Sequence, residues 1–287
     1  MTARRALLRS SIATLLLVAC SGEESIPSTT TTTPEMVETT TTTSTTSTTS
    51  TSTTTTLPPA EAVFSIGTSV KGASIDVIHR LDTVGARTAS DDPSRIVVLV
   101  VGVIHGDEQA GLDVVGHLRA MAPTDIPANV DLYLMPALNV DGLAMNQRHN
   151  ANGVDLNRNF PYEWGPIAQP GNWQYAGPSS ASEPETQAMV SYVEELRPDL
   201  TVWFHQDAFS IAPSTGPDKV VREEYARLTG LPLEGVPGGT YTGVAATWQR
   251  RTYTDDTTFI VELGGSLAPG EALTHARAIL SVSQILP

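Results

Sequence analysis

Two histidines and a glutamate of this chain directly follow strongly apolar segments. His105 and Glu108 come just after the apolar run 96–104, and His205 follows the run 200–204. Two imidazoles and one carboxylate are a suitable ligand set for Zn²⁺ that leaves a coordination position for water. A His-x-x-Glu pair alone is a weak signal, because such pairs also arise where a histidine enters a helix and the glutamate is exposed.

A second carboxylate, Glu262, lies inside an apolar segment at 257–263. Burying a charged carboxylate costs free energy unless it is paired or has a function. The alternative is that this face of the segment is exposed to water. In open α/β sheets ligands bind at the carboxyl ends of the strands, so Glu262 and the histidines are expected to meet there.

Apolar periodicity predicts a domain in which strands and helices alternate. The expected strands cover residues 63–66, 75–79, 96–104, 130–135, 200–204 and 257–263. The expected helices cover residues 107–121, 182–196, 218–228, 244–250 and 269–286. Such alternation predicts an α/β sheet flanked by helices. The stretch 136–181, rich in Asn, Gly and Pro, is expected to be a long functional loop.

A further motif lies in that loop, where residues 153–160 read GVDLNRNF. Together with Arg148, the His-x-x-Glu pair, His205 and Glu262, this ordered set resembles the zinc carboxypeptidase family of the carboxypeptidase A type. The resemblance covers essentially the whole domain. It implies a single mixed, mostly parallel central sheet flanked by helices and one bound Zn²⁺ ion.

The resemblance implies a catalytic centre. His105, Glu108 and His205 would ligate the zinc. Glu262 would be the general base that takes a proton from zinc-activated water. Asp155 would accept a hydrogen bond from the free ring nitrogen of His105 and so fix its tautomer, although it could also merely stabilise a turn.

The resemblance also implies substrate contacts. Arg148 would stabilise the oxyanion on the scissile carbonyl, and Asn157 with Arg158 would clamp a terminal carboxylate. Tyr241 lies roughly where digestive relatives place a substrate-capping tyrosine, and both a pocket role and a structural role remain open. Asp207 could bind the distal ammonium of diaminopimelate, support a residue that contacts the substrate, or be exposed.

Within the family, the sequence is similar to compact bacterial members, the murein peptide amidases. The supporting features are Arg148 ten residues before Arg158, the helix opening at 182–186 and the phrase at 204–206. Hydrolysis of the γ-D-glutamyl bond to diaminopimelate, next to a free carboxylate in peptidoglycan stem peptides, is therefore expected. The alternatives are a general C-terminal protein carboxypeptidase of the cell envelope and a wall-peptide-binding module without turnover.

The N-terminus is typical of an export signal. Three arginines precede the apolar run 12–19, which is too short to span a bilayer. The run ends Leu-Val-Ala before Cys20 and resembles a bacterial lipobox. We expect residues 1–19 to be a lipoprotein signal peptide and Cys20 to be lipidated, although a non-lipidated signal is the alternative. The expected location is the outer face of the cytoplasmic membrane, in the cell-wall space.

The segment after the signal is compositionally biased. Residues 28–56 contain 19 Thr and 5 Ser, too little apolar surface to offset the entropy of ordering. We therefore expect a disordered tether at 20–59 and a zinc peptidase catalytic domain at 60–287.

The composition excludes several other classes of protein. The formal net charge of −14 argues against binding to nucleic-acid phosphates. A single Cys excludes an internal disulfide and a Cys-rich zinc module. The expected partners are a peptide or muropeptide substrate and the membrane, and a monomer is expected.

Overall fold

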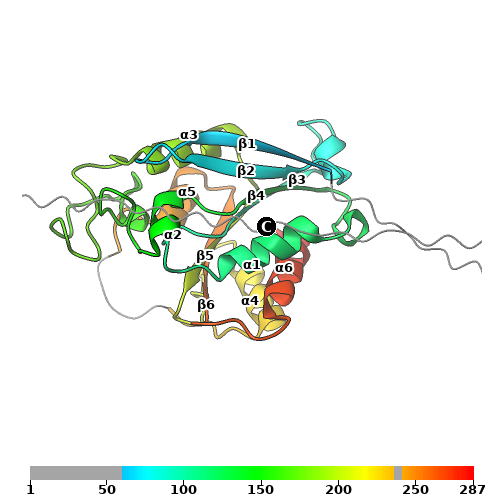
Figure 1. The fold of residues 1–287 in the computed structure, drawn as a ribbon. Helices are drawn as coiled ribbons and strands as arrows, with labels where there is room; N and C mark the ends of the chain where they lie inside the picture. Colours follow the sequence, from blue (N-terminus) through cyan, green and yellow to red (C-terminus); the bar gives the residue numbers. More distant parts are fainter. Residues whose placement is uncertain (1–59, 236–240) are drawn as a thin grey trace, which may run out of the picture. The chain divides into compact units, whose positions relative to one another are not determined.

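The computed structural model describes residues 60–235 and 241–287 (Figure 1). The chain divides into two units, residues 1–54 and 55–287, and every described residue belongs to the second. The predicted signal peptide, Cys20 and the predicted tether lie outside the described residues. Among the helices that are described, none has the length and apolar character needed to cross a membrane.

A six-stranded sheet forms the centre of the described unit. Its strands are β1 (Glu61–Thr68), β2 (Ser74–Arg80), β3 (Ile96–Val101), β4 (Val130–Met135), β5 (Leu200–Gln206) and β6 (Thr257–Leu263). They are ordered β1-β2-β4-β3-β5-β6. The β1–β2 and β2–β4 pairs are antiparallel, whereas the β3–β4, β3–β5 and β5–β6 pairs are parallel. The predicted mixed, mostly parallel sheet is confirmed.

Helices cover both faces of this sheet (Figure 1). The helices are α1 (Gly111–Ala120), α2 (Val140–Met145), α3 (Pro184–Leu196), α4 (Lys219–Thr229), α5 (Ala245–Thr252) and α6 (Glu271–Val282). Residues of α1, α4 and α6 share one buried apolar cluster, and residues of α3 and α5 belong to a second. The α/β fold flanked by helices is therefore as predicted.

The central position of β3 explains its uniformly apolar sequence. Val98 and Val100 pack into the first cluster, whereas Val97, Leu99 and Val101 pack into the second. A strand covered on both faces needs apolar side chains at every position. The carboxyl end of β3 emerges from this buried core and leads directly into the loop that carries His105.

The structure corrects two boundaries at this point. The strand predicted at 96–104 ends at Val101, and the helix predicted at 107–121 begins at Gly111. Residues 102–110 form a loop instead. A Cβ atom on Gly111 would lie 2.1 Å from the carbonyl oxygen of Gly102, so only glycine permits this close approach of helix to strand end.

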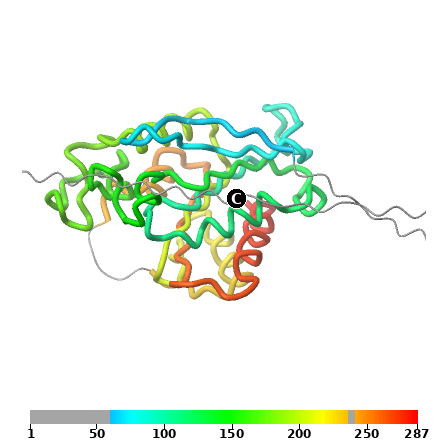
Figure 2. The backbone as a smooth tube through the Cα atoms, in the orientation of Figure 1, coloured from blue at the N-terminus to red at the C-terminus, as the bar shows by residue number. Residues whose placement is uncertain are grey.

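The long segment 136–181 extends beyond one end of the sheet, as the green trace in Figure 2 shows. It was predicted as irregular, but it contains α2 and a 3₁₀ helix at Leu156–Arg158. The side chain of Asn139 caps α2 by accepting a hydrogen bond from the N–H of Gly142 at 2.9 Å. Asp155 caps the 3₁₀ helix in the same way, through the N–H of Asn157 at 3.0 Å.

Candidate metal centre

Three side chains converge where β3 and β5 end. Nδ1 of His105 lies 2.8 Å from Oε1 of Glu108, and Nδ1 of His205 lies 2.9 Å from Oε2 of the same carboxylate. The two Nδ1 atoms are 3.1 Å apart. All three residues are buried, and they form a possible metal-binding group in which the ligand atoms lie within 4.8 Å of one another.

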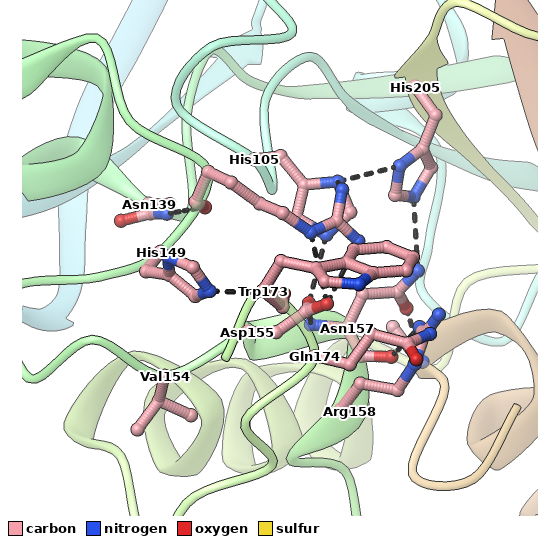
Figure 3. Close-up of polar contacts among 12 residues, drawn as sticks. His105, Asn139, His149, Val154, Asp155, Asn157, Arg158, Trp173, Gln174 and His205 are labelled. Carbon is pink, nitrogen blue, oxygen red and sulfur yellow. Dashed lines mark hydrogen bonds and ion pairs between the residues drawn. The ribbon is translucent and has the colours of Figure 1, made fainter. Parts of the chain in front are cut away.

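Asp155 orients the imidazole of His105 through the ring nitrogen that faces away from the other two ligands. Its Oδ1 lies 3.0 Å from Nε2 of His105, and the residue is fully buried (Figure 3). Burial works to raise the pKa of Asp155, but His105 and Arg148 hold that pKa well below its usual range. An ionised Asp155 accepts a hydrogen bond from the N–H at Nε2, so Nδ1 of His105 presents its lone pair to the group.

The donor set fits one Zn²⁺ ion. A lone pair of His105, a carboxylate of Glu108 and a nitrogen of His205 face one another, and such an arrangement is stable when a cation lies among them. Tetrahedral ligands at zinc distances of about 2.0–2.2 Å are separated by roughly 3.3–3.6 Å, so ligands now 2.8–3.1 Å apart would move apart by a few tenths of an ångström. Zinc is therefore the cofactor that these three side chains suit.

Arg148 lies against the same group. Its Nε and Nη2 donate to Oδ2 of Asp155 at 3.1 and 2.8 Å, and its Nη1 donates to Oε1 of Glu108 at 3.0 Å. The exposed Trp173 ring lies 5.2 Å from the guanidinium carbon. Asp155 therefore fixes both a histidine of the group and the arginine beside it.

The 3₁₀ helix presents Asn157 and Arg158 to the same region (Figure 3). Oδ1 of Asn157 accepts from the N–H of Ala245 at 3.0 Å, and its Nδ2 lies 3.3 Å from Nε2 of His205. Arg158 is almost fully buried, and burial lowers the pKa of its guanidinium. Its Nη1 donates to the carbonyl of Asn157 at 2.7 Å, while its Nε has no partner among the described residues.

Glu262 lies beside His205 across the sheet. The two residues are direct partners in the parallel β5–β6 register. The sequence left open whether Glu262 is buried or faces water, and in the structure Glu262 and its neighbour Ile260 are partly exposed. The reason is that a cavity opens over this face of β6, so the carboxylate meets solvent rather than core.

That cavity has a volume of about 460 Å³. It is lined by His105, Glu108, Arg148, Asn157, Arg158, Trp173, His205, Gln206, Asp207, Ala208, Ala212, Gly235, Tyr241, Val244, Thr247, Ile260 and Glu262. Every predicted metal, catalytic and substrate residue borders it, and Asp155 supports it from behind. Tyr241 is 48% exposed, and its ring lies 5.1 Å from the guanidinium carbon of Arg158.

Several residues in the cavity wall were not predicted from the sequence. Trp173, Thr247 and Ala212 belong to no motif, and only the folding of segments distant in sequence, including α5, brings them to the site. Gln206 belongs to the phrase at 204–206 singled out above, but the sequence did not predict its contacts.

Known proteins are similar to this chain over part of its sequence. The zinc carboxypeptidase family profile matches residues 49–214. Carboxypeptidase SOL1 of Arabidopsis thaliana is 32% identical over 155 residues, which cover 51% of this chain and 29% of that protein. Murein peptide amidase A of Escherichia coli (strain K12) is 35% identical over 124 residues, covering 39% of this chain and 50% of that protein. The matches thus span half or less of these relatives' own lengths.

Solved structures share the fold. The murein-tripeptide amidase MpaA from Escherichia coli O157 superposes with a TM-score of 0.60 at 24% identity, covering 80% of this chain and 93% of the other. Carboxypeptidase A from Helicoverpa armigera gives a TM-score of 0.65 at 18% identity, covering 79% and 68%. By its sequence match over residues 49–214, and with a ligand group suited to zinc in place, this chain belongs to the zinc carboxypeptidase family.

Proposed function

We propose that the protein hydrolyses the γ-D-glutamyl bond to diaminopimelate in peptidoglycan stem peptides, next to a free carboxylate. The observation that carries the proposal is one cavity bordered by the metal group, by Glu262 and by two arginines. A base, a charge-stabilising donor and a carboxylate-binding cation are the groups that such a hydrolysis needs.

Zn²⁺ held by His105, Glu108 and His205 would supply a Lewis acid and lower the pKa of a bound water. A carboxylate oxygen of Glu262 accepts the proton of the attacking water and then delivers it to the leaving amine nitrogen. The guanidinium of Arg148 donates N–H groups to the oxygen that gains negative charge in the transition state.

The substrate's free carboxylate is assigned to Arg158 and Asn157. The guanidinium of Arg158 is largely desolvated, which strengthens its attraction for an anion. Asn157 is held by the N–H of Ala245, so its position is fixed before substrate arrives. Tyr241 stacks over Arg158 and would close this part of the cavity.

The murein substrate has two supports. The first is the 35% identity to murein peptide amidase A of Escherichia coli. The second is that the cavity combines Arg148 and Arg158 with Asp207. Because Arg148 and Arg158 already have the roles assigned above, Asp207 is the group left for the distal end of diaminopimelate, whose ammonium a carboxylate attracts.

The test is to incubate the purified, zinc-loaded protein with a diaminopimelate-containing muropeptide and with a panel of ordinary peptides, followed by mass spectrometry. Release of diaminopimelate in preference to ordinary C-terminal residues is expected. Faster release of ordinary residues would identify a general carboxypeptidase. Binding of the muropeptide without product would identify a wall-peptide-binding module.

Replacing Arg158 by alanine is expected to weaken the use of substrates with a free carboxylate. Removing one partner of a desolvated charge pair costs about 2–5 kcal/mol, which corresponds to roughly 30- to 4,000-fold in kcat/KM. Comparison of kcat/KM on free and amidated forms of one peptide checks this. Arg227→Ala, an exposed arginine of α4, is the control. Equal loss on both forms would show that Arg158 does not bind the carboxylate.

We also propose that Cys20 carries lipid and that the protein is held at the outer face of the cytoplasmic membrane, beside the peptidoglycan. The support is the sequence that precedes this only cysteine. Two acyl chains on one cysteine provide the stable anchoring that a single chain does not. Labelling with a fatty-acid analogue should mark the wild-type protein but not Cys20→Ala, and an unlabelled wild-type protein contradicts the proposal.

A further inference from the structure

Gln206, the last residue of β5, connects two segments of the metal centre through its side chain. Its Oε1 accepts a hydrogen bond from the N–H of Ala110 at 2.8 Å. Its Nε2 donates to the carbonyl of Gly264 at 2.9 Å. Ala110 is two residues after Glu108, and Gly264 is two residues after Glu262. One amide thus joins the loop that carries metal ligands to the end of the strand that carries the base.

The main chain of Gln206 adds a third contact. Its N–H donates to Oε2 of Glu108 at 3.1 Å, the oxygen that also lies 2.9 Å from Nδ1 of His205. The carboxylate of Glu108 is therefore oriented by the end of β5. Because the ladder between β5 and β6 ends at the Gln206–Leu263 pair, the side-chain amide continues the hydrogen bonding past the last paired residue.

We propose that Gln206 is a positioning residue that fixes the distance between the metal ligand Glu108 and the base Glu262. A glutamine amide can accept at one end and donate at the other, and both abilities are used here. In Gln206→Glu the side chain can still accept from Ala110 but can no longer donate to Gly264. In Gln206→Met, where the side chain has a similar volume, it can do neither. The part of the proposal that concerns turnover rests on the role proposed for Glu262, whereas the part that concerns zinc does not.

The first variant is Gln206→Met. Loss of a group that supports metal ligands is expected to weaken zinc affinity by about 10- to 100-fold, measured by competition with a chelator in the absence of substrate. Because the distance between Glu108 and Glu262 is then no longer fixed, kcat should fall, whereas KM should change little.

The matched control is Gln249→Met. Gln249 is fully buried, and its Nε2 donates to Oγ1 of Thr201 at 2.9 Å, near the opposite end of β5. This variant also loses a buried hydrogen bond, so its melting temperature should fall, but its zinc affinity should match the wild type. Equal loss of zinc affinity in both variants would show general destabilisation and overturn the proposal.

Gln206→Glu separates the two bonds and serves if Gln206→Met does not fold. It keeps the acceptor for the N–H of Ala110, so zinc affinity should not fall, and it loses the bond to Gly264, so kcat should fall about tenfold or more. Wild-type kcat in this variant, or wild-type zinc affinity in Gln206→Met, would overturn the proposal. If the wild type turns over no muropeptide, the proposed substrate fails, while the zinc comparison still decides the positioning role.

Discussion

Replacing Glu262 by glutamine is expected to lower kcat by roughly 10²–10⁴-fold while zinc remains bound. The amide cannot accept the proton of the attacking water, yet it has almost the same volume as the carboxylate. Glu262 lies beside the ligand His205 in the sheet but is not part of the metal-binding group. Because Glu262 is partly exposed, unfolding stability should change by no more than about 0.5 kcal/mol.

The paired variant is His105→Ala, which removes one of three ligands and should lose zinc. Metal content, melting temperature and turnover of both variants are measured together. Loss of zinc from Glu262→Gln would make Glu262 a ligand and reopen the role of Glu108. Full activity of Glu262→Gln would place the general base elsewhere.

Replacing Asp155 by asparagine is expected to damage both the metal group and the fold. The carboxylate accepts from Nε2 of His105, from two nitrogens of Arg148 and from the N–H of Asn157. In Asp155→Asn the NH₂ group of the new amide would face N–H donors with which it cannot form a hydrogen bond. Zinc affinity should fall about 10- to 100-fold, and unfolding stability should fall by about 3–5 kcal/mol, because a buried partner of a charge is removed.

A second buried aspartate of the same region is the control. Asp141 accepts from Oγ of Ser69 and from the N–H of Lys71, both at 2.9 Å, and contacts no ligand. Asp141→Asn should lose about 1–3 kcal/mol of stability and keep its zinc affinity. Chelator competition and thermal unfolding of the two variants decide the matter, and unchanged zinc affinity in Asp155→Asn would remove Asp155 from the metal site.

The sequence predicts the sheet well because its signal is strong where burial is complete. The uniformly apolar β3 could hardly be anything but a covered strand. Helix α2 has six residues, too few for an apolar period to emerge, so only its cap at Asn139 could have indicated it. The start of α1 was placed four residues early, because the ligand loop before Gly111 contains residues that also suit a helix.

The candidate site was predicted where its residues belong to a motif or follow or interrupt an apolar strand, as His205 and Glu262 do, and not where other segments fold over it. Asp155, Asn157 and Arg158 belong to one recognisable segment, and they lie together in the structure. Trp173 reaches the cavity only because its loop folds back over Arg148. The exposure of Glu262 could not be decided from the sequence, since a local sequence does not reveal that a cavity lies over one face of its strand.

The direct pairing of His205 with Glu262 has a consequence for how such a protein diversifies. Adjacent strands are held about 4.8 Å apart by main-chain hydrogen bonds, whichever side chains they carry. Seven consecutive residue pairs fix β5 against β6, so the backbone sets the main-chain spacing between His205 and Glu262. Trp173 and Tyr241, by contrast, reach the cavity from segments outside the sheet. Under the proposed function, exchange of the segments that carry Trp173 and Tyr241 would change the cavity wall without changing the main-chain spacing of His205 and Glu262.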